Sequence, residues 1–386
     1  MEEAGRQAGR QAGRQAKYVP TEVTASRDPY ILFIERCLDL LKDGGIMAIV
    51  LPESVFHAPS LAYVRQFMLA ENNVRAIVDL PHNTFRPHCN AKTCLLVLEK
   101  GKPQQESIIM AAPEEMGHDH SGRVLYRQSS EEVWNDLVSV SEELVSPGAS
   151  ENDFVFLVNQ EKMDWDILVP RFYRRNRRSL KLPTDSTGIP LGTLVDEGVI
   201  GAWDGHGSPE SQMKGEGDVP YIRVSDIVNW EMYRNPVTGI PLHEYERVFG
   251  PNGRKPQEGD VILVRRGSYR IGTVAMASNR DEDVLLTKEL LTLRVLDKSN
   301  KYGIDQFYLL ASLSSRTVQE QIPDLVFIDT TLPNLGDRWR HLIIPVPKEL
   351  QAASKVAEKV RYAIEEKWSA QDRINELRSE WGGMTT

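Results

Sequence analysis

The sequence predicts a partial α/β region, then a mixed α+β domain rich in β-structure, and finally a long C-terminal helix. Helical segments alternate with short apolar segments from Asp28 to Lys100. Short β-type segments separated by Gly and Pro turns fill residues 189–347. Residues 348–380 carry an imperfect apolar stripe at helical spacing. With 386 residues, the chain is long enough for two or three domains.

The composition is ordinary for a soluble globular protein, with 41% apolar and 26% charged residues. We expect no membrane segment, because no apolar run reaches about 18 residues, and no secretory signal. Cys37, Cys89 and Cys94 show no metal-ligand spacing, so we expect a reducing, cytoplasmic location and no bound metal. A net charge of −9 excludes a uniformly basic surface but allows a local basic patch.

The first region is predicted to form two helices and three strands. Residues 29–42 have helical spacing, with Asp28 suited to cap the start and Gly44-Gly45 suited to end the helix. A second helix is expected over 61–69. Strands that are apolar on both faces are expected over 46–51, 74–80 and 93–98. This alternation predicts a largely parallel sheet.

Five segments are expected along the chain. Residues 1–17 repeat AGRQ three times and form a low-complexity lead, and residues 18–122 form the α/β region. Residues 123–185 are interpreted as a linker with a basic collar, LVPRFYRRNRRSLK at 168–181. Residues 186–347 form the second domain. Residues 348–386 form a helix that packs on a partner helix or folds back on its own domain.

Two groups of motifs resemble one family of systems. LFIERCLDLLKDGG, MAIVLPESVF, VRAIVDLP, AKTCLLVLEK and EEMGHDHSGR, within 28–122, resemble the C-terminal half of type I restriction-modification adenine-N6 DNA methyltransferases. GDVPYIRVSDI (217–227), GDVILVRRGSYRIG (259–272) and LIIPVPKELQ (342–351) resemble a target-recognition domain of the specificity subunits. The resemblance implies a partial Rossmann-like methyltransferase sheet, a DNA recognition domain and a spacer-like helix, in that order.

Two motifs of the methyltransferase family do not occur in this sequence. In the family, a Gly-containing loop binds S-adenosylmethionine, and an Asn/Asp-Pro-Pro-Phe/Tyr segment grips the target amine. Residues 27–30, RDPY, superficially resemble the second motif but lack one proline, and Pro29 is already explained as a helix start. Whether the chain is an enzyme is therefore uncertain. We expect it to be inactive alone, without an N-terminal half.

The resemblance implies roles for two aromatic residues. Phe33 matches the aromatic that contacts the adenine of S-adenosylmethionine, and its alternative role is a core position of an amphipathic helix. Phe85 matches the aromatic that stacks on the flipped target adenine. It follows a predicted strand, at the end where such folds bind ligands. Its alternative role is to cover the sheet edge.

Basic residues in two places are expected to contact DNA, because arginine and lysine bind phosphate and arginine reads guanine edges. Alternatively, the first group forms a solvated charged face with the nearby aromatics in the core, and the second belongs to a plain linker. The recognition-domain group is Arg223, Arg265, Arg266, Ser268, Arg270 and Lys288, and the collar group is Arg174 and Arg175.

The expected partners are double-stranded DNA and a separately encoded methyltransferase N-terminal half, or other restriction-modification subunits bound through the C-terminal helix. The leading hypothesis is thus a DNA-binding part of a restriction-modification system. The alternatives are a non-catalytic DNA specificity or docking protein and a decayed methyltransferase fragment, whose half-sheet would expose an apolar edge.

Overall fold

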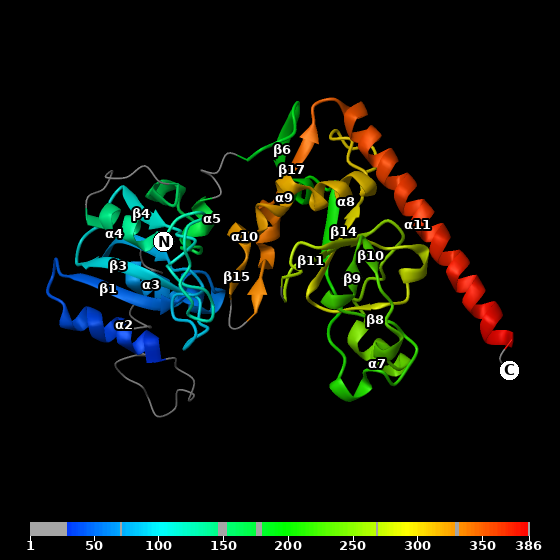
Figure 1. Cartoon of the computed structure of the whole chain (residues 1–386), viewed down its shortest axis with the longest axis horizontal. Coiled ribbons are helices and arrows are strands. Elements are labelled where there is room, and N and C mark those ends of the chain that lie inside the picture. Colours follow the sequence, from blue (N-terminus) through cyan, green and yellow to red (C-terminus); the bar gives the residue numbers. More distant parts are fainter. Residues whose placement is uncertain are drawn as a thin grey trace. The chain divides into compact units, whose positions relative to one another are not determined.

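The computed structural model describes residues 29–69, 72–145, 153–174, 180–267, 269–328 and 332–384. The chain divides into two compact units (Figure 1). Unit 1 comprises residues 1–179 and 327–331, and unit 2 comprises residues 180–326 and 332–386. The AGRQ lead and the Arg27-Asp28 part of RDPY lie outside the described residues.

Unit 1 is built on a five-stranded sheet flanked by short helices. Its strands are β1 (Ile46–Pro52), β2 (Asn72–Asp79), β3 (Thr93–Lys100), β4 (Ser107–Ala111) and β5 (Val155–Asn159), with β15 (Phe327–Ile328) joining the unit late in the sequence. Its helices are α2 (Pro29–Leu40), α3 (Ala62–Leu69), α4 (Leu137–Val145) and α5 (Pro170–Arg174), and its 3-10 turns are η1 (Glu53–Phe56), η2 (Pro59–Leu61) and η3 (Gln160–Lys162).

The expectation of a largely parallel sheet is wrong. The strand order is β1-β3-β2-β4-β5, and β2 with β4 is the one parallel pair among these strands. The strands β1, β2 and β4 do run in the same direction. However, β3 lies between β1 and β2 and runs opposite to both, because it returns directly after the loop at 80–92. The apolar pattern of a strand does not indicate which strands become its neighbours, so the position of β3 between β1 and β2 could not be predicted from it.

The edge strand β1 is less covered than its apolar sequence predicts. Met47 and Leu51 are buried, whereas Ile46 is 51% exposed and Val50 is 44% exposed. In contrast, the central strand β2 buries Val74, Ala76, Ile77 and Val78 almost completely. The core of unit 1 therefore centres on β2, and the side of β1 is a partly apolar surface.

Residues 123–185, which were expected to be a linker, also differ from the prediction. The described residues between 153 and 174 add β5 to the sheet edge and place α5 inside unit 1. All five residues of α5 are buried. The reason is that Phe172 and Tyr173 supply apolar area, while the arginines of this helix find acceptors within the unit.

Unit 2 is mostly β-structure with a long terminal helix. Its central sheet has the antiparallel order β12-β11-β14-β7, with bounds Val274–Met276, Val261–Val264, Leu290–Val295 and Ile200–Asp204. The other strands are β6 (Ser186–Pro190), β8 (Tyr221–Ile222), β9 (Ile227–Val228), β10 (Glu231–Met232), β13 (Leu285–Leu286), β16 (Pro333–Asn334) and β17 (Ile343–Pro347). The α-helices are α6 (Leu191–Asp196), α7 (Leu242–Phe249), α8 (Gln306–Ser314), α9 (Arg316–Gln319), α10 (Ile322–Leu325) and α11 (Leu350–Met384). The 3-10 turns are η4 (Ser211–Met213), η5 (Val224–Asp226), η6 (Pro236–Thr238), η7 (Asn279–Asp281) and η8 (Gly336–His341).

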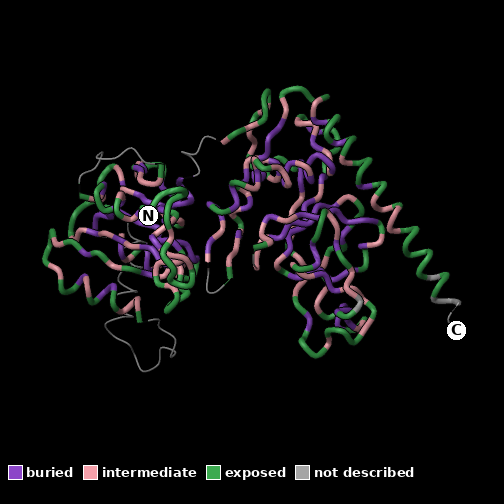
Figure 2. The backbone as a smooth tube through the Cα atoms, viewed as in Figure 1, coloured by how far each residue is buried: buried purple, intermediate pink, exposed green. Residues whose placement is uncertain are grey.

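The first half of α11 packs against its own unit through buried apolar residues, whereas the second half is held mainly by polar contacts. Ala353, Ala357 and Ile364 are buried, and the helix contacts α8. Beyond this point the helix is mostly exposed (Figure 2), with Ile374 at 50% and Leu377 at 57%. The expected alternative of a helix that folds back is therefore observed for the first half, while an apolar stripe remains on the second.

Candidate functional site

Phe85 lies in the loop that follows β2, and its side chain is 40% exposed. The loop is held by internal hydrogen bonds: Cys89 N donates to Phe85 O over 2.8 Å, and Thr84 Oγ1 donates to Pro81 O over 2.6 Å. At the far end of the loop, Lys92 Nζ lies 2.5 Å from Asp79 Oδ1 at the end of β2. This is the carboxyl end of β2, which pairs in parallel with β4, and parallel α/β sheets bind ligands at such ends. Base stacking by Phe85 stays a prediction.

Phe33 is 63% exposed on α2, whereas its neighbours Ile34 and Leu38 are buried. Phe33 is therefore not a core residue of this helix. The ring is open to solvent in the described residues, and the Gly-containing loop of the family is not in the sequence. The described residues thus do not by themselves fit a complete S-adenosylmethionine site. A cofactor contact at Phe33 stays a prediction.

A buried cluster of charges lies at the ends of β1 and β2. Arg171 Nη1 donates to Asp79 Oδ2 over 2.6 Å, and Arg171 Nη2 donates to Glu53 Oε1. Burial raises the pKa of the Glu53 carboxyl. Burial would also raise the pKa of Asp79, but the charges of Arg171 and Lys92 together hold it below its usual value. Sequence reasoning missed this cluster, although acidic residues directly after apolar strands were a visible signal.

The predicted DNA contact Arg174 is also engaged inside unit 1. It is 8% exposed, and its Nη1 donates to Ala112 O and to Glu114 Oε1, each over 3.0 Å. Arg174 is therefore buried and does not belong to a solvated basic collar. The cause is that the short helix α5 directs its arginines toward acceptors inside unit 1. Arg175 lies outside the described residues.

Three predicted arginines lie in the loop that joins β11 to β12. Arg265 Nη1 is 2.9 Å from Asp204 Oδ1 and 3.9 Å from Asp337 Oδ1, so acidic neighbours offset much of its charge. Arg270 Nη1 donates to Ile227 O over 3.0 Å. The Nε atom of Arg266 is buried and has no hydrogen-bond partner among the described residues. Ser268, in the same loop, lies outside the described residues.

Arg223 and Lys288 differ in their surroundings. The Arg223 guanidinium donates two hydrogen bonds to the Asp226 carboxylate, from Nε to Oδ2 over 2.9 Å and from Nη2 to Oδ1 over 3.0 Å. This pair also closes the turn η5, because Arg223 N donates to Asp226 Oδ2. Lys288 is exposed in the turn between β13 and β14. A DNA contact stays a prediction for both residues.

The aromatics near these arginines are not uniformly core residues. Tyr221 is 4% exposed and packs in a cluster with Ile240 and Tyr245. The Trp203 ring lies against two guanidinium groups, with Arg294 Cζ at 4.8 Å and Arg254 Cζ at 5.2 Å from its centroid. Tyr269, in contrast, is 91% exposed. The interpretation of the aromatics as core residues therefore holds for Tyr221 and is wrong for Tyr269.

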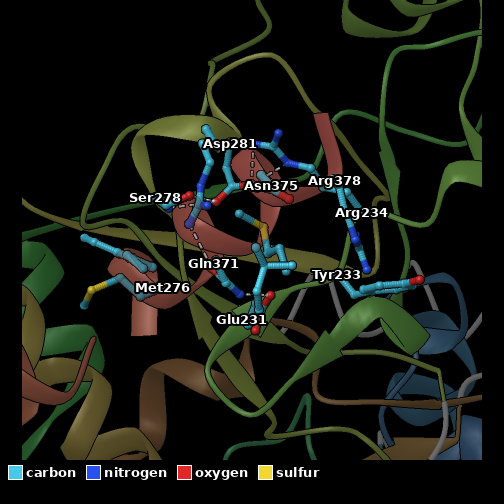
Figure 3. Close-up of a pocket in the computed structure, with 13 residues that line it drawn as sticks. Glu231, Tyr233, Arg234, Met276, Ser278, Asp281, Gln371, Asn375 and Arg378 are labelled. Atoms are coloured by element: carbon cyan, nitrogen blue, oxygen red, sulfur yellow. Dashed lines mark hydrogen bonds and ion pairs between the residues drawn. The ribbon is translucent and has the colours of Figure 1, made fainter. Parts of the chain in front are cut away.

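A cleft of about 330 Å³ lies between α11 and the segments β10, β12 and η7 (Figure 3). Polar contacts beside it fasten the helix. Arg280 donates to Gln371 Oε1 over 2.8 Å and to Asp372 Oδ1 over 2.7 Å. Within the cleft, Arg234 donates to Asp281 Oδ1 over 3.0–3.1 Å. The paired charges identify this cleft as part of the attachment of α11, which the sequence did not reveal.

Within the described ranges, no three His, Cys, Asp or Glu side chains group as metal ligands. No helix among the described residues is long and apolar enough to cross a membrane.

Comparison with known proteins finds similarities over unit 1. Residues 7–174 match the family model described as N-6 DNA Methylase. The chain is similar to the methylase subunit of the type I restriction enzyme EcoEI of Escherichia coli, with 31% identity over 91 residues. That match covers 23% of this chain and 18% of the relative. The similarity is thus to methylases of restriction-modification systems.

Two solved structures from such systems are also similar. The type IIG restriction endonuclease BpuSI gives a TM-score of 0.36 and 13% identity, covering 92% of this chain and 47% of that chain. The type I restriction-modification S subunit from M. genitalium gives a TM-score of 0.33 and 19% identity, covering 51% of this chain and 45% of that chain. This chain spans less than a fifth of the length of the methylase subunit and less than half of each of these structures.

Proposed function

We propose that this chain is a DNA-binding part of a restriction-modification system. Unit 1 supplies part of an adenine-N6 methylase, and unit 2 supplies a DNA recognition domain. The observation that carries the proposal is the family match over residues 7–174, followed in the same chain by a second unit with an arginine-rich loop at 265–270. The resemblance of segments 217–227 and 259–272 to specificity subunits supports the role of unit 2.

Methyl transfer to an exocyclic adenine amine is mainly a positioning problem. The base must leave the duplex, and polar acceptors must orient its amine toward the methyl donor. S-adenosylmethionine, when bound, supplies the methyl group. In this chain Phe85 stacks on the flipped base, a contact worth about 1–3 kcal/mol in comparable sites. The groups that hold the donor and grip the amine are supplied by a partner, so the chain alone binds DNA without methylating it.

The proposed DNA-contacting residues of unit 2 differ in how strongly other residues of the protein bind them. Lys288 and Arg266 bind phosphates, because neither side chain is committed to a carboxylate in the described contacts. Arg265 and Arg270 border the same surface, and Ser268 belongs to their loop. Arg223 presents its guanidinium from a turn that it also stabilises. Gly267, with φ +129°, allows the backbone to approach a phosphate closely.

Two apolar surfaces are suited to bind the partner. The first lies on the neighbouring elements α2 and β1, where Phe33 and Leu40 are exposed at 63% and 69% and Ile46 and Val50 are also exposed. An edge strand with exposed apolar residues is a ready site for pairing with another chain. The second is the stripe Ile374, Leu377 and Trp381 on α11, whose spacing of three and four residues suits a partner helix. Ile374 also borders the cleft between α11 and its own unit, so Leu377 and Trp381 form the more exposed part of the stripe. A methylase N-terminal half occupies the first surface, and another restriction-modification subunit occupies the second.

A non-catalytic specificity or docking protein is the second candidate. The exposed apolar residues of α2 and β1 favour it equally, because they suit docking whether or not the completed assembly is catalytic. The discriminating measurement is methyl transfer by the chain co-purified with a separately encoded N-terminal half. Transfer to adenine in that complex favours the split enzyme. A stable complex without transfer favours the docking protein.

The test of the proposed function is a binding titration of the purified chain with duplex DNA between 50 and 200 mM salt, with labelled S-adenosylmethionine in a parallel reaction. We expect binding that weakens steeply with salt, and no labelled DNA. Methyl transfer by the chain alone would show that it contains a complete catalytic site, contrary to the proposal. Absence of binding at 50 mM salt would refute the DNA-binding role.

A further inference from the structure

Tyr269 stands out on the surface of unit 2. Its side chain is 91% exposed, the highest value among the aromatic side chains that the structure describes. It lies near the tip of the loop between β11 and β12, among Arg265, Arg266 and Arg270. A single exposed aromatic is common on protein surfaces and alone indicates nothing. The anchored loop and the neighbouring arginines are what point to a role for Tyr269.

The loop is anchored to the unit on both sides of Tyr269. Before it, Arg265 N donates to Glu289 O over 3.0 Å, and Gly267 N donates to Pro333 O over 3.1 Å. After it, Gly272 N donates to Val264 O over 2.8 Å, and Gln319 Nε2 donates to Gly272 O over 2.9 Å. The exposed ring is therefore carried by a loop whose two ends are held in place.

Gly272 makes the second anchor tight. Its φ is +92°, a conformation that favours glycine, and an added Cβ would lie 2.2 Å from Ile322 Cδ1. The backbone thus packs directly on α10 at this point. A contact residue on an anchored loop loses little conformational freedom on binding, which favours affinity.

Arg270 links the ring to the positive charge of the loop. Its Cζ lies 5.6 Å from the Tyr269 ring centroid, within the range of a cation–π contact, and its Nη1 is tied to Ile227 O. Asp204 and Asp337 face Arg265, so the uncompensated charge beside the ring comes from Arg266 and Arg270. A flat apolar ring beside cations is complementary to duplex DNA, whose grooves combine base edges and sugars with phosphates.

We infer that Tyr269 is a DNA-contacting residue, whose ring packs against bases or deoxyribose in a groove of the duplex while the neighbouring arginines bind phosphates. This inference rests on the proposed function, and it names one residue of unit 2 that contacts the DNA. Because the contact is made by an uncharged ring, it adds affinity that salt does not screen. It therefore differs in kind from the contacts of Arg266 and Lys288.

The test compares Tyr269→Ala and Tyr269→Phe in duplex DNA binding by the full chain. We expect Tyr269→Ala to raise the Kd about tenfold, as for truncation of an aromatic contact residue, and Tyr269→Phe to keep it within about twofold of the wild type. The slope of log Kd against log salt stays unchanged in both, since no charge is removed. Tyr362→Ala is the matched control, because Tyr362 is a 64% exposed tyrosine on α11, and its Kd stays within about twofold.

The outcomes separate the inference from the proposed function. If the wild type binds DNA and Tyr269→Ala binds equally well, the inference fails and the proposed function stands. If Tyr269→Phe loses as much affinity as Tyr269→Ala, the hydroxyl group makes the contact and the packing of the ring is refuted. If the wild type does not bind at low salt, both fail. Unchanged circular dichroism of Tyr269→Ala establishes that the loss comes from the contact, as expected for an exposed side chain.

Discussion

Arg171 and Asp79 form a buried ion pair in unit 1, with Nη1 and Oδ2 separated by 2.6 Å. The guanidinium of Arg171 also binds Glu53, and its Cζ lies 4.9 Å from the ring centroid of Phe327. Ile328 N donates to Glu53 Oε1 over 3.2 Å. One side chain from the expected basic collar therefore connects α5, two strand ends and the late segment 327–328 within unit 1.

Replacement of Arg171 by Met should destabilise unit 1 strongly. The change keeps most of the side-chain volume but leaves Glu53 and Asp79 buried with Lys92 as the remaining cation of the cluster. Removal of one partner of a buried ion pair costs about 3–5 kcal/mol. The measurement is the free energy of unfolding in urea, read from hydrogen exchange of amides in β2 and β3.

Arg127→Met provides the control for this prediction. Arg127 Nε lies 3.4 Å from Glu132 Oε1 and its Nη2 lies 3.7 Å from Asp136 Oδ1, but its own side chain is 47% exposed. A pair of this kind contributes about 0–1 kcal/mol. A loss of less than about 1 kcal/mol for Arg171→Met would show that the buried cluster does not stabilise unit 1 as we argue.

Unit 2 should lose stability in mild acid because of His206. Its Nδ1 accepts from Leu286 N over 3.0 Å, and its Nε2 lies 2.9 Å from Arg254 O, which together select the neutral ring. Burial lowers the pKa of His206. The unfolded chain therefore binds a proton at this residue at a higher pH than the folded chain. The contribution of neutral His206 to the stability of unit 2 is therefore complete above about pH 6.5, the pKa of histidine in the unfolded chain. It decreases as the pH drops toward the lower pKa of His206 in the folded state.

Urea titrations of wild type and His206→Gln between pH 7.5 and 5 measure this effect. Glutamine retains hydrogen-bonding capacity but does not titrate, so the pH dependence caused by residue 206 should disappear. His82→Gln, in an exposed loop of unit 1, should leave the pH dependence of unit 2 unchanged. Identical pH profiles for the wild type and His206→Gln would contradict the prediction.

Local patterns in the sequence were sufficient to locate several of the helices and strands. The helix expected at 29–42 is α2 (Pro29–Leu40), and the strand expected at 93–98 is β3 (Thr93–Lys100). The helix expected at 348–380 is α11 (Leu350–Met384). Periodicity and turn residues determine such elements locally. For this reason, the predictions hold even where the tertiary arrangement was not foreseen.

Features that depend on residues distant in sequence were not predictable in the same way. The insertion of β3 between β1 and β2 depends on pairing across the sheet, and the burial of Arg171 depends on Asp79, 92 residues away. A row of arginines gives the same pattern whether it faces solvent or buried carboxylates. The exposure of Tyr269 was likewise unpredictable, because Tyr221 in a similar strand-and-turn context is buried.

Lys288→Ala should weaken DNA binding in a way that depends on salt. Lys288 is exposed, so we expect its ammonium group to neutralise one phosphate of the bound duplex. Removal of one such contact lowers the slope of log Kd against log salt by about 0.9. Fluorescence anisotropy of labelled duplex at several salt concentrations measures the slope. Lys359→Ala, an exposed lysine on α11, should leave it unchanged, and an unchanged slope for Lys288→Ala would exclude a phosphate contact.

Arg223→Ala should act differently, because this arginine has a structural role that Lys288 lacks. Asp226 is 3% exposed and accepts two bonds from the Arg223 guanidinium. Alanine removes both of these donors from the buried carboxylate, which costs about 1–3 kcal/mol of unit 2 stability. Urea unfolding should therefore detect Arg223→Ala and not Lys288→Ala. Arg223→Lys should restore the stability incompletely, since an ammonium group cannot reproduce the bidentate geometry. Equal unfolding midpoints for Arg223→Ala and the wild type would mean that this pair contributes nothing to the turn η5.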